Sequence, residues 1–197
     1  MSHARRLTIF AIGMLSLLGG AAATAGAVTW HNTGSTAFTA TSGAQTLGST
    51  TTSLNCLGAT ATGDVPVGST VNTVLRASGT VTYSGCSIAG INTGVDCSYT
   101  LTASTQSGSQ VTGDVDLTCG WYQFGTRICH AAGSVHAIYT NPVAGVGTLT
   151  LTTGGNLIAL SPGTGFTCPL GNGDRTHVAE TTFRTTSANP PIITRTA

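Results

Sequence analysis

The most constraining feature of this chain is a repeated alternation of apolar and polar residues with a period of two. It is clear in Thr80-Val81-Thr82-Tyr83, in 98–102 and in 114–119, and it is the pattern of a strand with one buried face. Downstream of residue 27, no segment has the 3.6-residue apolar period of a helix. Threonine, which occurs 38 times, suits strands because it is β-branched. The chain is therefore predicted to be all-β.

The strands are predicted to be short and numerous, roughly ten to twelve, separated by Gly, Ser and Asn turns. The clearest hairpin spans 148–160, with a turn at Gly154-Gly155. This organisation predicts an antiparallel β-sandwich or barrel. A β-solenoid is the alternative, although no period of about 20 residues recurs. Further strands are expected near 36–41, 50–57, 69–76, 127–139 and 176–186.

The N-terminus has the order of a secretory signal. Arg5 and Arg6 precede an apolar run over 7–18, and small residues follow up to Ala27. The apolar run is shorter than the roughly 20 residues that span a membrane. We therefore predict a signal peptide over 1–27 and no stable membrane insertion after its cleavage.

The rest of the chain is long enough for one domain with a core of its own. We expect a single β domain over 28–186 and a C-terminal tail over 187–197, where the alternation ends. Such a protein would be secreted or associated with the cell surface.

Charge excludes one class of partner. Downstream of residue 27 the chain has five arginines, six acidic residues and no lysine, a net charge of −1. Proteins that bind nucleic acid need several cations to displace counterions from phosphate. No nucleic-acid partner is expected, and no basic patch for a membrane surface is present.

Six cysteines lie downstream of the export signal. In an oxidising compartment an even number of cysteines indicates disulfides. The strand phase places Cys56, Cys97, Cys119 and Cys168 on the same parity as neighbouring apolar residues, so these four are expected to face the core. Zinc sites favour close Cys-x₂-Cys pairs, which the chain lacks, so neither a metal nor another cofactor is expected.

Spacing along the chain predicts the disulfide pairing. Cys86 and Cys97 flank one short segment, and Cys119 and Cys129 flank another. Each pair is predicted to pin the base of a loop, which leaves Cys56 to bond Cys168 and join the early and late parts of the domain.

The sharpest local signal is the aromatic cluster Trp121, Tyr122 and Phe124, which lies between Cys119 and Cys129. A pinned loop would present these rings to a sugar or to a protein partner. The alternative is that the loop folds back and its aromatic side chains cap the open end of the core.

Catalytic and metal-binding patterns are weak. His130 and His136 share a face of one predicted strand but stand about 20 Å apart. Asp114 and Asp116 share one face of another predicted strand. Two carboxylates supply too few oxygens for a calcium site, and the concave site that a glycosidase needs is not visible in the sequence. These residues are interpreted as surface groups, as are the two histidines. Ser134 does not lie in a nucleophile motif.

Several short motifs resemble a recurrent kind of exported, β-rich actinobacterial protein with several disulfides. They are Leu54-Asn55-Cys56, 82–86, Cys97 and 165–168, within a region of about 50–185. The resemblance implies an exported β domain. It carries over no catalytic residue.

Three functions are compatible with these observations. The first is a non-enzymatic binding module for a cell-envelope glycan or another surface protein, with Trp121, Tyr122 and Phe124 as contacts. The second is a structural protein that assembles through uncharged strand edges. The third is a hydrolase of envelope polymers in which His130, Asp174 and His177 take part. No catalytic residue is assigned.

Overall fold

The computed structural model describes residues 28–48, 52–66, 68–71, 74–152, 158–162, 168, 175–178 and 180–196. Every regular element in these ranges is a β-strand, which confirms the all-β prediction. No helix that could cross a membrane occurs in the described ranges. The predicted signal peptide over 1–27 and the predicted Gly154-Gly155 turn lie outside them.

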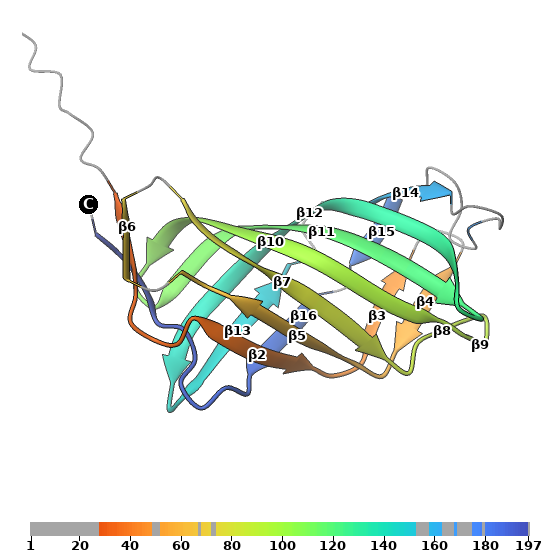
Figure 1. Ribbon diagram of the computed structural model, residues 1–197, viewed down its shortest axis with the longest axis horizontal. Helices are drawn as coiled ribbons and strands as arrows, with labels where there is room; N and C mark the ends of the chain where they lie inside the picture. The colour runs from red at the N-terminus through yellow and green to blue at the C-terminus, as the bar shows by residue number, and fades with distance from the viewer. Residues whose placement is uncertain are drawn as a thin grey trace, which may run out of the picture.

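Eight antiparallel strands close into a barrel (Figure 1). In the order in which they pair, each strand bonds the next, and the pairing of β11 with β12 closes the ring. The prediction of an antiparallel sandwich or barrel is thus confirmed in its barrel form. The strands are β11 (Gln110–Gln123), β10 (Gly94–Ser107), β7 (Leu75–Ser84), β5 (Gly58–Asp64), β2 (Ala37–Ser42), β16 (Thr181–Thr185), β13 (Val146–Leu151) and β12 (Thr126–Val143).

Shorter strands prolong the barrel wall at one end, on the right in Figure 1. Each is the chain neighbour of a barrel strand, so β2 runs into β3, β7 into β8 and β13 into β14. The whole is therefore an up-and-down meander of long, partly interrupted strands. The short strands are β14 (Ile158–Pro162), β15 (Arg175–Val178), β3 (Gln45–Gly48), β4 (Ser53–Cys56), β8 (Ser87–Ile88) and β9 (Ile91–Asn92).

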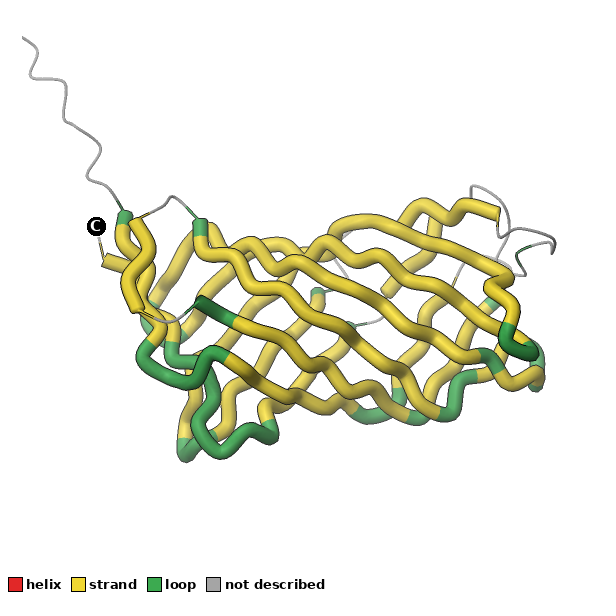
Figure 2. Tube along the Cα trace, in the orientation of Figure 1, coloured by secondary structure: helices red, strands yellow, loops and turns green. Residues whose placement is uncertain are grey.

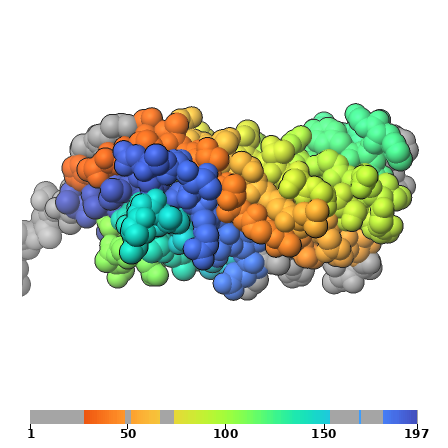
Figure 3. Space-filling model, turned by 90° about the horizontal axis from the view of Figure 1, so that it is seen from below, coloured from red at the N-terminus to blue at the C-terminus, as the bar shows by residue number. Residues whose placement is uncertain are grey.

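A separate three-stranded sheet covers the opposite end. It joins β1 (Thr29–Asn32) to β17 (Ile193–Thr196) and to β6 (Gly68–Val71). Segments from the two ends of the described chain consequently lie side by side (Figure 3). Trp30 is fully buried there, in an apolar cluster with Val65, Leu75 and Ile193. The segment 187–197, predicted as a tail, thus includes a strand of this cap.

The alternation of the sequence becomes the inside and outside of the barrel. In β7, Val81 and Tyr83 are buried, whereas Thr80 and Thr82 are exposed. Outward threonines also bond across strands, as in the 3.2 Å contact between the hydroxyls of Thr62 and Thr80. The outer face is therefore polar but carries little charge.

Two glycines allow one tyrosine to lie along the inner wall. Gly63 and Gly79 face each other across β5 and β7, and Tyr99 is the partner of Gly79 on β10. A Cβ on Gly63 would lie 2.3 Å from the Tyr99 hydroxyl oxygen, and one on Gly79 would lie 2.0 Å from the backbone oxygen of Thr62. Any side chain at these positions would force the wall apart.

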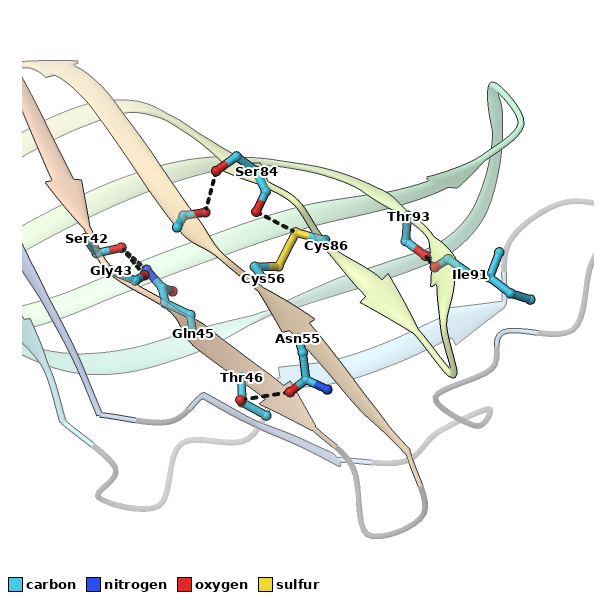
Figure 4. The surroundings of a disulfide bond; sticks show 11 residues. Ser42, Gly43, Gln45, Thr46, Asn55, Cys56, Ser84, Cys86, Ile91 and Thr93 are labelled. Atoms are coloured by element: carbon cyan, nitrogen blue, oxygen red, sulfur yellow. Dashed lines mark hydrogen bonds between the residues drawn. A yellow bond between two sulfur atoms is a disulfide. The ribbon is translucent and has the colours of Figure 1, made fainter.

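The predicted disulfide pairing is wrong. The bonds are Cys56–Cys86, Cys97–Cys119 and Cys129–Cys168, and all six cysteines are buried. Figure 4 shows the first of them, between the end of β4 and the residues after β7.

Register explains the difference. Cys97 stands directly opposite Cys119 in the β10–β11 pair, so these two residues bond across neighbouring strands. Cys119 faces Ala131 on β12, two positions from Cys129. The inward phase was correctly predicted for Cys56, Cys97, Cys119 and Cys168, but closeness along the chain did not predict which cysteines meet.

Candidate functional site

The three aromatic residues of the predicted cluster point to three different places at the β11–β12 hairpin. Trp121 has no exposed surface and belongs to the main core. Tyr122 is half-buried, and Phe124 is 97% exposed. The cluster is therefore divided between core and surface, and Trp121 is out of reach of a surface ligand.

The hairpin that carries Phe124 ends in a two-residue turn. Phe124 and Gly125 have φ values of 49° and 77° and lie between the paired residues Gln123 and Thr126. Two left-handed residues in succession make a type I′ turn, which favours Asn-Gly. Figure 2 shows this loop, in green, at the end of the barrel where β11 meets β12.

A phenylalanine is an unfavourable residue for this turn. The left-handed conformation costs about 1–2 kcal/mol for a residue with a side chain, and bulky residues adopt it rarely. The ring of Phe124 is too exposed to recover this energy by packing. Folding stability therefore does not account for a phenylalanine at this position.

Next to the turn, Tyr122 lines an open groove on the outer face of the barrel. A Cβ on Gly120 would lie 2.9 Å from the Tyr122 hydroxyl oxygen and 3.1 Å from its ring carbons. The edge of the ring that carries the hydroxyl therefore packs against the backbone of Gly120. This glycine provides the space that an aromatic platform needs.

Polar side chains surround the platform. Asp96, Gly120 and His130 form one row across β10, β11 and β12. The backbones of Asp96 and His130 are therefore about 10 Å apart, two strand spacings, with the glycine between them. Arg127 lines the same groove. The groove is completed by the hydroxyl residues Thr80, Thr82, Ser98 and Thr118.

The two charged groups of the groove are not engaged elsewhere. Neither the Asp96 nor the Arg127 side chain makes a hydrogen bond or ion pair with another residue of the described chain. Both side chains are exposed. A carboxylate that accepts hydrogen bonds and a guanidinium that donates them are thus both available beside an aromatic ring.

The other predicted candidates do not converge on this groove. His136 lies farther along β12, where its Nδ1 is 3.3 Å from the Oδ1 of Asp114 on the neighbouring strand. This exposed pair contributes at most about 1 kcal/mol. Asp116 faces Ser134 in the same pair of strands.

The remaining hydrolase candidates cannot be placed in full. His177 lies in β15, where the structure describes the backbone alone, and Asp174 lies outside the described residues. Within the described ranges, no three His, Cys, Asp or Glu side chains gather as a metal site would require.

Comparison with protein-family models, with curated protein sequences and with solved structures finds no match to this chain. The geometry of its own residues therefore carries the functional argument.

Sequence reasoning missed Asp96, Gly120 and Arg127. A signal for the first was present, because Asp96 precedes the inward-facing Cys97 and so had to point outward. Nothing in the sequence, however, placed it beside Tyr122. That neighbourhood depends on the register of β10 with β11, in which Gly94 faces Tyr122.

Proposed function

We propose that this protein is an exported, non-enzymatic binding module that recognises a neutral saccharide of the cell envelope. The observation that carries the proposal is the Tyr122 ring, which packs against Gly120 in an open groove that is also lined by a carboxylate and a guanidinium without side-chain partners in the described chain. The three disulfides fit a site of action in an oxidising, extracellular compartment.

The chemistry of the groove matches a sugar ring. One face of a pyranose or furanose is largely C–H and stacks on an aromatic ring, while its hydroxyls need acceptors and donors around the edge. Asp96 accepts from such hydroxyls and Arg127 donates to them. With one full charge of each sign, the groove favours a neutral ligand.

Phe124 extends this site. It lies on the same hairpin, two residues beyond Tyr122, and leaves its ring free in solvent. A rigid aromatic ring offers a large contact area at a low entropy cost. We assign it to a second sugar unit of a longer chain.

The two alternative functions have less support. Assembly through strand edges needs unpaired edges. Closure pairs both sides of each of the eight barrel strands, and in the cap sheet the edge strands β6 and β17 have only four residues each. A hydrolase needs a nucleophile or a pair of acids in a concave site. In the described groove, Asp96 is the sole carboxylate.

Replacing Tyr122 tests the platform. Tyr122→Ala is expected to lower the affinity for an oligosaccharide at least about fivefold, since one base-sized stacking contact is worth about 1–3 kcal/mol, whereas Tyr122→Phe keeps most of the affinity. The measurement is titration calorimetry against neutral hexasaccharides of glucose, mannose, galactose and arabinose. His136→Ala, on the same face but outside the groove, is the matched control. Failure of the wild-type protein to bind any neutral saccharide would overturn the proposal.

Replacing Phe124 separates stability from binding. Phe124→Asn is expected to raise the free energy of unfolding by about 1 kcal/mol, because asparagine tolerates the left-handed conformation, and to weaken binding of hexasaccharides. Ala144→Asn is the control, since Ala144 and Gly145 form the same type of turn, with φ values of 52° and 82°, between β12 and β13. It should stabilise the fold without changing the affinity. Urea denaturation measures the stability of both variants, and titration calorimetry measures their affinity for hexasaccharides. A destabilised Phe124→Asn variant would show that the ring packs in the fold after all.

A further inference from the structure

The barrel also contains an internal cavity, separate from the outer groove. It has a volume of about 70 Å³, and its lining extends from Tyr83, near the end of β7, to Pro191 and Ile193 beside the cap. A single water needs roughly 10–15 Å³ by this kind of measure. The cavity thus has room for an unbranched chain of several heavy atoms.

The cavity exists because several inward positions carry small side chains. Ala40, Ala61, Ala77 and Ala103 are all buried and all line it. An eight-stranded barrel has an interior that side chains can just fill, or that can hold one small ligand. Alanine at four inward positions leaves this interior partly unfilled.

The lining carries no charge and few polar groups. Its four hydroxyl residues are Tyr83, Tyr99, Tyr139 and Thr185. Three of them are already bonded to the backbone: Tyr99 donates to Thr62 O at 3.3 Å, Tyr139 to Pro191 O at 2.6 Å, and Thr185 to Gly147 O at 3.3 Å. Their donor capacity is used within the fold.

Tyr83 differs from the other three. Its side chain is only 7% exposed, and its hydroxyl makes no hydrogen bond in the described chain. This hydroxyl is therefore free to donate to an acceptor supplied from outside the chain. Burial raises the pKa of Tyr83 to about 12, and the phenol therefore remains a neutral donor at ordinary pH.

We infer that the barrel interior binds a slender, neutral, apolar molecule whose single acceptor oxygen takes the hydrogen bond of Tyr83. Ketones, esters and alcohols with a short unbranched chain have this chemistry. A carboxylate does not fit, because no cationic side chain lines the cavity to offset its loss of hydration. This site is independent of the saccharide groove.

The test uses 2-hexanone as the ligand, hexane as the apolar molecule without an acceptor, and hexanoate as the anion. Binding is followed by methyl chemical shifts of the lining residues Val81, Val115 and Leu117. The full-length protein should bind 2-hexanone more tightly than hexane, and hexanoate not at all. Tyr83→Phe should lower the affinity for 2-hexanone by about threefold to tenfold, which corresponds to the loss of one hydrogen bond, and should leave the affinity for hexane unchanged.

A cavity-filling variant completes the test. Ala61→Leu should abolish binding of both 2-hexanone and hexane, and Ala77→Leu does the same if the first variant fails to fold. Neither Tyr83→Phe nor the filled variant should alter saccharide binding, so the two proposals can fail separately. Absence of binding by the wild-type protein, or an unchanged 2-hexanone affinity in Tyr83→Phe, would overturn the inference.

Discussion

Replacing Trp121 by alanine is expected to lower the free energy of unfolding by about 3–5 kcal/mol, the usual range for a buried aromatic side chain. Trp121 has no exposed surface. It packs in the main core at the end of the barrel where the disulfides lie, among buried residues such as Cys119 and Cys129. Truncation leaves a cavity, and the disulfide-bonded strands around it cannot move inward to fill it.

The size of this loss decides between the two interpretations of the aromatic cluster. Urea denaturation of Trp121→Ala and Phe124→Ala gives the comparison, with Phe124→Ala expected to stay within about 0.5 kcal/mol of the wild type because its ring is exposed. If Trp121→Ala kept its stability but lost saccharide binding, Trp121 would instead be a contact for the ligand at the surface.

A second variant removes the indole N–H but keeps an aromatic ring in the core. The Nε1 of Trp121 is buried and has no hydrogen-bond partner in the described part of the chain, and a buried donor without an acceptor costs about 1–3 kcal/mol. Trp121→Phe removes this donor together with part of the ring. Its destabilisation is therefore expected to be clearly smaller than that of Trp121→Ala.

The alternation of the sequence predicted which way side chains point, because the period of a strand is a local property. Val81 and Cys97 lie inside, and Thr80 and Asp96 lie outside, as their parity indicates. Parity does not determine register. Which residues face each other depends on where each hairpin turns, and here a Phe-Gly turn stands where sequence rules expect Asn-Gly or Gly-Gly.

Both the disulfides and the candidate groove depend on register, which is why the sequence alone could not predict them. Cys97 meets Cys119, and Asp96 lines up with Gly120 and His130, only because β10 and β11 pair over their full length. The cap was missed for a different reason. Its strand β17 follows Pro190 and Pro191 and buries only Ile193, too short a pattern to indicate a strand.

Loss of the Cys129–Cys168 bond is the second large effect expected. Its partners are 39 residues apart, the longest separation among the three bonds, and the chain-entropy model gives a loop of this size about 4 kcal/mol. Both cysteines are buried, so Cys129→Ala and Cys168→Ala are combined to avoid a free thiol. The double variant should lose about 2–5 kcal/mol in urea denaturation without reductant.

Peptide mapping without reductant provides the control, because the double variant should retain Cys56–Cys86 and Cys97–Cys119. A Cys86–Cys97 peptide in the wild-type protein would contradict the register of β10.

The Cys97→Ala, Cys119→Ala double variant is the matched comparison. Its bond closes 22 residues between strands that already pair along their whole length, so its loss should destabilise the fold less. If both double variants lose the same stability, the Cys97–Cys119 bond within the β10–β11 hairpin contributes as much as the Cys129–Cys168 bond that ties Cys168 to β12.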